Sequence, residues 1–213
     1  MIGNDIVDLR QARQESNWRR PRYLAKIFTP EEQQLIADAH RPTAMVWLLW
    51  SCKEAAYKRW ASEHQQRSFF PNKIEVQGFQ QVQETGLHHA AADGESSHLP
   101  YTSSVQIMGH CYTVHTFLKG DLIHSWTLPE EKKLLLRKVD ALPCSTLSEA
   151  TRSLVYKHLE QCFQWSPADL SIQKNEQGRP FVYYQNKQSP LSLSLAHHGR
   201  YGGFVLAGSE HFL

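Results

Sequence analysis

The most restrictive feature of this sequence is a long apolar run, residues 44–60, that also contains charged side chains. Its large apolar residues recur at helical intervals, at Met45, Leu48, Leu49, Cys52, Ala56 and Trp60. This period predicts a mostly buried helix over residues 43–63. The helix places Glu54 and Lys58 on one face, either as a solvated bridge or as part of a functional site.

The chain begins with a short apolar segment that is interrupted by carboxylates. Residues 2–7 predict a β-strand that carries Asp5, and Asp8 follows directly after it. Asp8 has two open roles. It is either an acidic site residue or the cap of a helix that begins at Leu9 or Arg10.

Composition excludes several classes of protein. With 213 residues, 41% hydrophobic and 21% charged, the chain is expected to be soluble, as one domain or as two small lobes. A net charge of +2 argues against a nucleic-acid binder. We expect a cytoplasmic protein without a membrane segment, since there is no run of eighteen apolar residues and no signal peptide. Four cysteines without C-x-x-C spacing indicate reduced thiols, at positions Cys52, Cys111, Cys144 and Cys162.

Residues 10–26 form the most basic segment of the chain, with Glu15 as their only acid. The basic residues are Arg10, Arg13, Arg19, Arg20, Arg22 and Lys26. Such a run is either a solvated face or a docking surface for an acidic partner. The next segment has Thr29 at a helix cap and Pro30 at the first helical position, which predicts a helix to about Ala39.

The remaining elements divide the chain into two halves at residues 118–121. Residues 83–98 are expected to be an exposed loop whose histidines are solvated, and a hairpin follows at 101–118. In the second half we expect helices at 129–141 and 147–163, and strands at 122–128, 170–173, 179–184, 191–199 and 203–207. The predicted fold class is α+β, with two similar lobes at 1–120 and 121–213. Each lobe is expected to be a small, mostly antiparallel sheet packed against helices.

Two motifs of the first half, Gly3 to Leu9 and Trp50 to Lys58, resemble the 4'-phosphopantetheinyl transferase superfamily. That family has an Asp in its first strand and a Glu in a W-x-x-K-E-A-x-x-K helix. The threonine-then-acidic helix start at residues 27–32 also resembles the family. One position departs from the two-lobed class, because Val7 stands where that class has a second acid.

The second half resembles the same family. Gly178-Arg179-Pro180 is similar to its G-K-P turn, and residues 193–197 are similar to its L-S-I-S-H strand, with Ala196 in place of the second serine. The first lobe resembles the short holo-acyl-carrier-protein synthase type, and the lobe order is reversed relative to the surfactin-synthetase type. The resemblance covers residues 1–76 and 147–207 and implies a pseudo-dimer of two lobes.

The resemblance implies a Mg²⁺-dependent enzyme, a holo-acyl-carrier-protein synthase type of transferase. It would move the 4'-phosphopantetheine group of coenzyme A onto a serine of an acyl or peptidyl carrier protein. Asp5 and Glu54 are the implied metal ligands, with Asp8 as a further candidate. Glu54 and Lys58 are the implied catalytic residues. The alternative is a non-catalytic module of the same fold that binds coenzyme A or a carrier protein.

The resemblance also implies which residues bind coenzyme A: Lys53, Arg152, Arg179 and His197. From the residues alone, Arg179 is equally an exposed turn arginine. His197 shares a strand face with Leu191, Leu193 and Leu195, so a buried core histidine is its alternative. Because both lobes lie in one chain, we expect a monomer with one complete site in the first lobe's Asp5 and Glu54 and the second lobe's Arg179 and His197.

Overall fold

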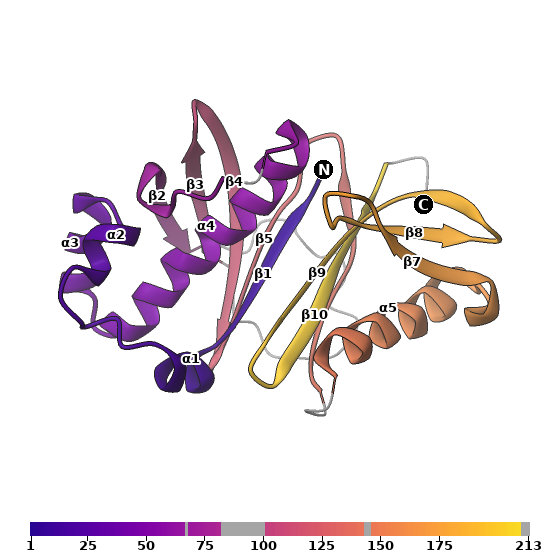
Figure 1. Cartoon of the computed structure of the whole chain (residues 1–213), viewed down its shortest axis with the longest axis horizontal. Helices are drawn as coiled ribbons and strands as arrows, with labels where there is room; N and C mark the ends of the chain where they lie inside the picture. The colour runs from indigo at the N-terminus through magenta and orange to yellow at the C-terminus, as the bar shows by residue number, and fades with distance from the viewer. Residues whose placement is uncertain (67, 82–100, 143–145, 210–213) are drawn as a thin grey trace.

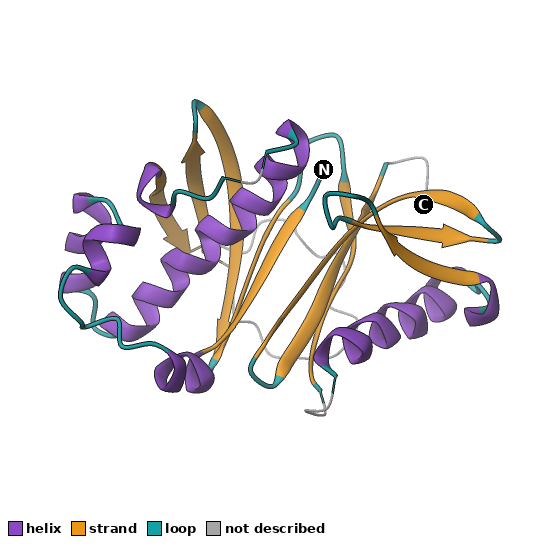
Figure 2. Ribbon diagram, in the orientation of Figure 1, coloured by secondary structure: helices purple, strands orange, loops and turns teal. Residues whose placement is uncertain are grey.

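Two five-stranded antiparallel sheets lie side by side in the computed structural model, which describes residues 1–66, 68–81, 101–142 and 146–209 (Figures 1 and 2). The first sheet has the order β1-β5-β4-β3-β2. Its strands are β1 (Gly3–Asp8), β2 (Ile74–Gln81), β3 (Tyr101–Ile107), β4 (His110–Lys119) and β5 (Leu122–Thr127). The second sheet has the order β6-β10-β9-β8-β7. Its strands are β6 (Lys133–Ala141), β7 (Leu170–Lys174), β8 (Pro180–Tyr184), β9 (Lys187–His198) and β10 (Tyr201–Gly208).

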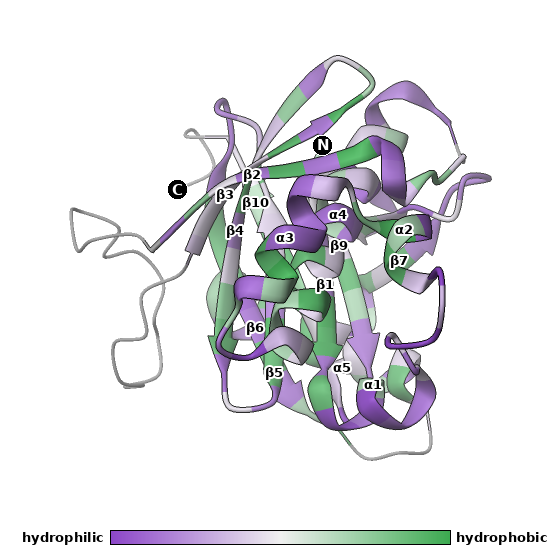
Figure 3. Cartoon of the chain, turned by 90° about the vertical axis from the view of Figure 1, so that its left-hand side faces the viewer, coloured by the Kyte–Doolittle hydropathy of each residue, from purple (hydrophilic) through white to green (hydrophobic). Residues whose placement is uncertain are grey.

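The helices divide between the sheets. The first lobe has α1 (Leu9–Glu15), α2 (Tyr23–Ile27), α3 (Pro30–Asp38), α4 (Pro42–His64) and the short η1 (Pro71–Lys73). The second lobe has α5 (Leu147–Phe163) and η2 (Pro167–Asp169). Figure 3 shows α1 and α3 as largely hydrophilic helices on the outside of the first lobe. Both sheets follow one strand order, so the α+β prediction with two similar lobes is confirmed.

Helix α4 covers the first sheet because its apolar residues face the strands over its whole length. Leu49, Cys52, Ala55 and Ala56 are fully buried on this face. At one point the strand and the helix almost touch, since a Cβ atom on Gly3 would lie 2.1 Å from the Ala55 backbone oxygen. Only glycine permits this approach, which brings β1 and its carboxylates directly beneath α4.

The two lobes meet where β1 of the first sheet lies against β9 and β10 of the second. A small apolar cluster fills this contact and contains Ile2, Trp126, Val205 and Ala207. The first core lies between α4 and its sheet, and the second between α5 and its sheet. The contact between lobes therefore has a core of its own, beside the strand that carries Asp5.

A buried ion pair attaches α4 to α3. Lys53 Nζ lies 2.5 Å from Glu32 Oε2, and both side chains have no exposed surface. Lys53 also donates to the backbone oxygens of Ile27 and Pro71, each at 2.8 Å. Glu32 completes the predicted cap of α3, because it accepts from Thr29 N while Thr29 Oγ1 accepts from Glu32 N.

Two expectations about the middle of the chain differ from the structure. The helix expected at residues 129–141 is wrong, because residues 133–141 form strand β6. Its leucines and lysines favour a helix locally, but β10 is buried and takes β6 as a second hydrogen-bonded neighbour. Strand β5 pairs with β1, so the chain passes from one sheet to the other after Thr127 and not at residue 120.

The other expected elements are present. The hairpin is β3 and β4, and the helix expected at 147–163 is α5 with those bounds. The loop expected at 83–98, with its histidines, lies outside the described residues, as does Cys144. Among the described helices, none combines the length and apolar character needed to cross a membrane.

Replacement of Lys53 by methionine tests the buried pair. We expect Lys53→Met to lower the free energy of unfolding by about 3–5 kcal/mol, because it leaves the Glu32 carboxyl buried without its cation. Urea denaturation measures the change. Lys26→Met is the matched control, since Lys26 is exposed, and it should change stability by less than about 0.5 kcal/mol. Equal effects of the two substitutions would contradict this role of Lys53.

Candidate functional site

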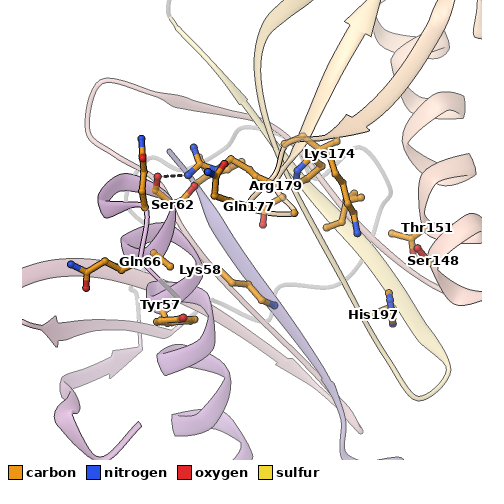
Figure 4. Close-up of a pocket in the computed structure, with 18 residues that line it drawn as sticks. Tyr57, Lys58, Ser62, Gln66, Ser148, Thr151, Lys174, Gln177, Arg179 and His197 are labelled. Carbon is orange, nitrogen blue, oxygen red and sulfur yellow. Dashed lines mark hydrogen bonds between the residues drawn. The ribbon is translucent and has the colours of Figure 1, made fainter. Parts of the chain in front are cut away.

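A cavity of about 550 Å³ lies between the two lobes (Figure 4). Four parts of the chain line it: the C-terminal half of α4, the first turns of α5, the turn between β7 and β8, and the end of β9. Its volume is typical of a pocket for a small molecule or cofactor. The first lobe contributes α4 together with Ile2, and the second lobe contributes the other three parts, so the cavity exists only when the lobes are joined.

The lining of the cavity mixes apolar and polar residues, and its charged side chains are basic. Lys58 comes from the first lobe, whereas Lys174, Arg179 and His197 come from the second, and Figure 4 shows all four around the same space. Of the described residues that line it, none is acidic. Cationic side chains without carboxylates favour an anionic ligand, and phosphate groups are a natural match for arginine and lysine.

The turn between β7 and β8 brings Arg179 to the cavity. Gly178 has φ +77°, which glycine adopts without strain, and Asn175 Oδ1 accepts from Arg179 N at 2.9 Å. The Arg179 guanidinium then crosses the cleft and donates to the backbone oxygen of Ser62 on α4. Partial burial lowers the pKa of Arg179 below its ordinary value. The structure therefore shows a half-buried residue that bridges the lobes and not a free turn arginine.

His197 is an exposed residue that lines the cavity. The alternative of a buried core histidine is therefore wrong. Leu193 and Leu195, on the same strand face, also line the cavity. The alternation predicted which face His197 occupies, but not that this face becomes part of a cavity.

Asp5 and Glu54 lie together beside the cavity, although neither is among the residues that line it. Lys58 connects Asp5 to the cavity, because the Lys58 Nζ atom lies 3.0 Å from Asp5 Oδ1 and 2.9 Å from the Asn4 backbone oxygen. Lys58 itself lines the cavity. The other oxygen of Asp5, Oδ2, is buried without a hydrogen-bond partner.

The Glu54 carboxyl is strongly perturbed. Burial, the larger cause, and the nearby Asp5 charge together raise the pKa of Glu54 from 4.5 to about 7, although Lys58 opposes the shift. Two carboxylates that share a partly dry site repel each other unless a proton or a cation lies between them. A raised carboxyl pKa beside a basic cavity is a common property of functional sites.

The carboxylate pair fits a divalent cation. Mg²⁺ prefers carboxylate oxygens and completes its coordination with water and substrate phosphates, so one or two protein carboxylates suffice. The unpartnered Asp5 Oδ2 and the high pKa of Glu54 are both relieved by a cation. Within the described residues, no group of three His, Cys, Asp or Glu side chains forms a metal site on its own.

Asp8 lies apart from this pair, in the position that caps α1. Its Oδ1 accepts from Arg10 N at 3.0 Å, and its Oδ2 accepts from Arg200 N at 3.2 Å. The Arg200 guanidinium is also 3.1 Å from Oδ2. The capping role is therefore present, and both Asp8 oxygens have partners in the second lobe or in α1.

Two of the residues that were expected to bind coenzyme A do not line the cavity. Lys53 is fully buried in the pair with Glu32, on the opposite side of α4 from Lys58. Arg152 is half-buried on α5 and is not among the lining residues, although its neighbours Ser148 and Thr151 are. The sequence shows that a basic residue is present at each of these positions, but not which way the helix turns its side chain.

Several lining residues were missed by the sequence analysis. They are Tyr57, Ser62, Gln65, Gln66, Ser148, Thr151, Lys174, Gln177 and Ser194. A partial signal exists for Lys174 and Gln177, because both lie close in sequence to the Gly178-Arg179-Pro180 turn motif. The polar residues on α4 and α5 give no signal, since in sequence they are indistinguishable from the solvated face of a helix.

The pKa of Glu54 yields a prediction. Asp5→Asn should lower this pKa because it removes a like charge, and Lys58→Met should raise it because it removes an opposite one. A pH titration of the Glu54 side-chain carboxyl by ¹³C NMR measures both.

Between pH 4.5 and about 7 the native Glu54 carboxyl retains a proton that the unfolded chain releases. The free energy of unfolding contributed by Glu54 should therefore fall as pH rises through this window. Glu54→Gln should abolish that fall, and an unchanged pH profile would contradict the shift.

Comparison with known proteins supplies the family. No curated protein matches the chain. Among solved structures, the chain is similar to the holo-[acyl-carrier-protein] synthase (AcpS) of Thermotoga maritima, with 9% identity and a TM-score of 0.38, over 88% of this chain and 83% of that one. Residues 1–111, more than half of the sequence, match the family described as the 4'-phosphopantetheinyl transferase superfamily. This match includes β1, α4 and the carboxylate pair, and the chain therefore belongs to the 4'-phosphopantetheinyl transferase superfamily.

Proposed function

We propose that this protein transfers the 4'-phosphopantetheine group of coenzyme A to a serine hydroxyl of an acyl or peptidyl carrier protein, with Mg²⁺. The observation that carries the proposal is the basic cavity between the lobes, with the Asp5 and Glu54 pair at its side. Membership of the superfamily supports the type of reaction, and the residues around the cavity are the candidates for its steps.

In this proposal the cavity binds coenzyme A through its phosphate groups. Arg179, His197 and Lys174 provide positive or hydrogen-bonding groups from the second lobe, and Lys58 provides one from the first. The Arg179 guanidinium, which donates to Ser62 O in the free protein, exchanges this neutral acceptor for a phosphate oxygen. Hydrogen bonds to charged acceptors are the stronger ones, so the exchange is favourable.

Asp5 and Glu54 would hold Mg²⁺ in this proposal. The ion supplies Lewis-acid stabilisation of the charge that develops on the diphosphate oxygens during transfer. Lys58 is fixed by Asp5 and by the Asn4 carbonyl, so its ammonium group already lies at the cavity wall before the substrate binds. A charge that is held in place in advance stabilises the transition state without reorganisation.

The reaction itself is a substitution at phosphorus. The serine oxygen forms a bond to the phosphorus that carries the pantetheine arm, and the bond from this phosphorus to the bridging oxygen breaks. Adenosine 3',5'-diphosphate leaves, and the serine proton must be removed. We assign Glu54 a part in this removal, because its carboxylate, ionised when the cation is bound beside Asp5, can accept a proton from the serine hydroxyl.

The carrier protein is proposed to dock on residues 10–26. Arg19, Arg20 and Arg22 are exposed there, close in sequence to the strand that holds Asp5. The Arg19 guanidinium lies 4.2 Å above the Trp18 ring, and Trp18 packs against the first core. This contact restricts Arg19 on the surface, where a positive group suits an acidic carrier helix.

The same chain supplies both walls of the cavity, which supports a monomer as the active form. The alternative is a module of the same fold that binds coenzyme A or a carrier without chemistry. Retention of two adjacent carboxylates in a partly dry site disfavours it, because they destabilise the fold unless they bind a cation or a proton.

Transfer is tested by mixing the protein with coenzyme A, Mg²⁺ and an apo carrier protein, and weighing the carrier by mass spectrometry. We expect Asp5→Ala and Glu54→Gln to reduce the rate about a thousandfold, because each removes a metal ligand and several kcal/mol of transition-state stabilisation. Lys157→Gln, on the exposed side of α5, is the control. Specific activity should not depend on enzyme concentration if a monomer is active. Near-normal turnover by either carboxyl variant at saturating Mg²⁺ would refute the metal assignment.

Charge reversal tests the docking surface. We expect Arg22→Glu, and more strongly Arg19→Glu with Arg22→Glu, to raise the KM for the carrier while coenzyme A binding stays unchanged. The wild-type KM should rise with salt, since the Debye length shrinks to about 3 Å at 1 M, and that of the double variant should rise less. Lys157→Glu with Lys187→Glu changes the same number of exposed charges in the second lobe and should leave the KM unaltered. Normal modification by the first double variant at low salt would show that residues 10–26 are only a solvated face.

A further inference from the structure

Four polar side chains form a connected row through the contact between the lobes. Arg137 on β6 lies 3.2 Å from His124 on β5, measured from Nη1 to Nδ1. His124 Nε2 lies 3.3 Å from the Asn4 side-chain amide on β1. The other amide atom of Asn4 lies 2.7 Å from Ser194 Oγ on β9. Asn4 and His124 have no exposed surface, and Ser194 is 7% exposed.

The row has only one consistent direction of donation. A guanidinium donates and cannot accept, so His124 Nδ1, which faces Arg137, must be the unprotonated nitrogen. Burial and the positive charge of Arg137 hold the pKa of His124 well below its usual value, which keeps the ring neutral. The single ring proton therefore lies on Nε2, and Nε2 donates toward Asn4.

This direction determines how the Asn4 amide is turned. In the structure the amide nitrogen faces His124 Nε2 and the amide oxygen faces Ser194 Oγ. In that orientation the Asn4 NH₂ group and the protonated His124 Nε2, both donors, face each other. The two amide ends have the same shape and differ in their hydrogen atoms, so the surrounding network decides their assignment. Rotation of the amide by 180° places its oxygen toward His124 and its NH₂ group toward Ser194.

The rotated amide changes the role of Ser194. Its Oγ atom accepts from Asn4, so the hydroxyl proton is not used in this bond. Ser194 lines the cavity. We propose that Asn4 is a positioning residue that orients the Ser194 hydroxyl as a hydrogen-bond donor into the cavity, toward an oxygen of the diphosphate of coenzyme A.

The diphosphate is the part of the ligand that this donor fits. The Asn4 backbone oxygen accepts from Lys58 Nζ, which is also bonded to Asp5, while the Asn4 side chain reaches Ser194. One residue thus connects a donor from each lobe, and both donors line the cavity beside the carboxylate pair. The identity of the acceptor rests on the proposed function, whereas the direction of the hydrogen bonds does not.

Imidazole ¹⁵N NMR tests the direction of the row in the free protein. Histidine is labelled selectively, and the His124 signals are those that disappear in His124→Gln. We expect a neutral ring with the proton on Nε2 between about pH 6 and 8. A proton on Nδ1, or a charged ring, would overturn the inference, whether or not the protein binds coenzyme A.

Calorimetric titration with coenzyme A, without metal or carrier, tests Ser194. We expect Ser194→Ala to bind about tenfold to a hundredfold more weakly, the usual effect of losing a hydrogen bond to a charged group. Ser194→Thr should retain most of the affinity. Ser192→Ala is the matched control, because it removes a hydroxyl from the same strand face at a residue outside the cavity lining. The loss should be the same with dephospho-coenzyme A, which keeps the diphosphate but lacks the 3'-phosphate.

The role of Asn4 is tested in combination with Ser194. If Asn4 acts through this hydroxyl, Asn4→Ala with Ser194→Ala should bind coenzyme A no more weakly than the weaker single variant. Wild-type affinity in Ser194→Ala would overturn the inference while the proposed function stands, as would a loss that disappears with dephospho-coenzyme A. Absence of coenzyme A binding by the wild type would refute the proposed function, and the NMR experiment would still decide the direction of the row. Ser194→Ala alone keeps the test decisive if Asn4→Ala does not fold.

Discussion

The close approach of β1 to α4 at Gly3 is the constraint on which the rest of the site depends. A side chain at this position would lie 2.1 Å from the Ala55 backbone oxygen, so the strand reaches the helix only because glycine has no Cβ atom. With the strand this close, Asp5 lies near Glu54 and within 3.0 Å of Lys58. The raised pKa of Glu54 follows from the same geometry, since burial and a neighbouring carboxylate both favour its protonated form.

Two lysines in helix α4, Lys53 and Lys58, differ in how far they are buried. Lys53 is enclosed by Glu32 and two backbone oxygens, so its charge is satisfied inside the first lobe and attaches α4 to its neighbours. Lys58 keeps part of its surface in the cavity between the lobes, where a ligand can reach it. The sequence motif that contains both lysines does not show which of them is buried. Only the direction in which the helix turns each side chain distinguishes a buried ion pair from a side chain that a ligand can reach.

The contact between the lobes does more than hold them together. It has its own apolar cluster around Ile2 and Trp126, and the polar row from Arg137 to Ser194 crosses it. Buried polar groups are tolerated where every donor finds an acceptor, and such networks fix one arrangement of the surrounding elements. The cavity borders this contact, so the relative position of the lobes and the placement of its polar groups are determined together.

The sequence by itself determined most of the local structure and named several residues that the structure brings to the cavity or beside it. Helical periodicity predicted α4, the Thr29 cap predicted α3, and the family motifs placed Asp5, Glu54, Lys58, Arg179 and His197 among the candidates, because each depends on residues close together in the chain. Tertiary structure decided the rest. The strand at 133–141 was predicted as a helix because its partner, β10, lies far away in sequence. Lys53 and Arg152 were expected to bind coenzyme A but do not line the cavity, whereas Lys174 and Ser194 line it and were not expected, because a cavity between two lobes is formed by the packing of segments that no local pattern relates to one another.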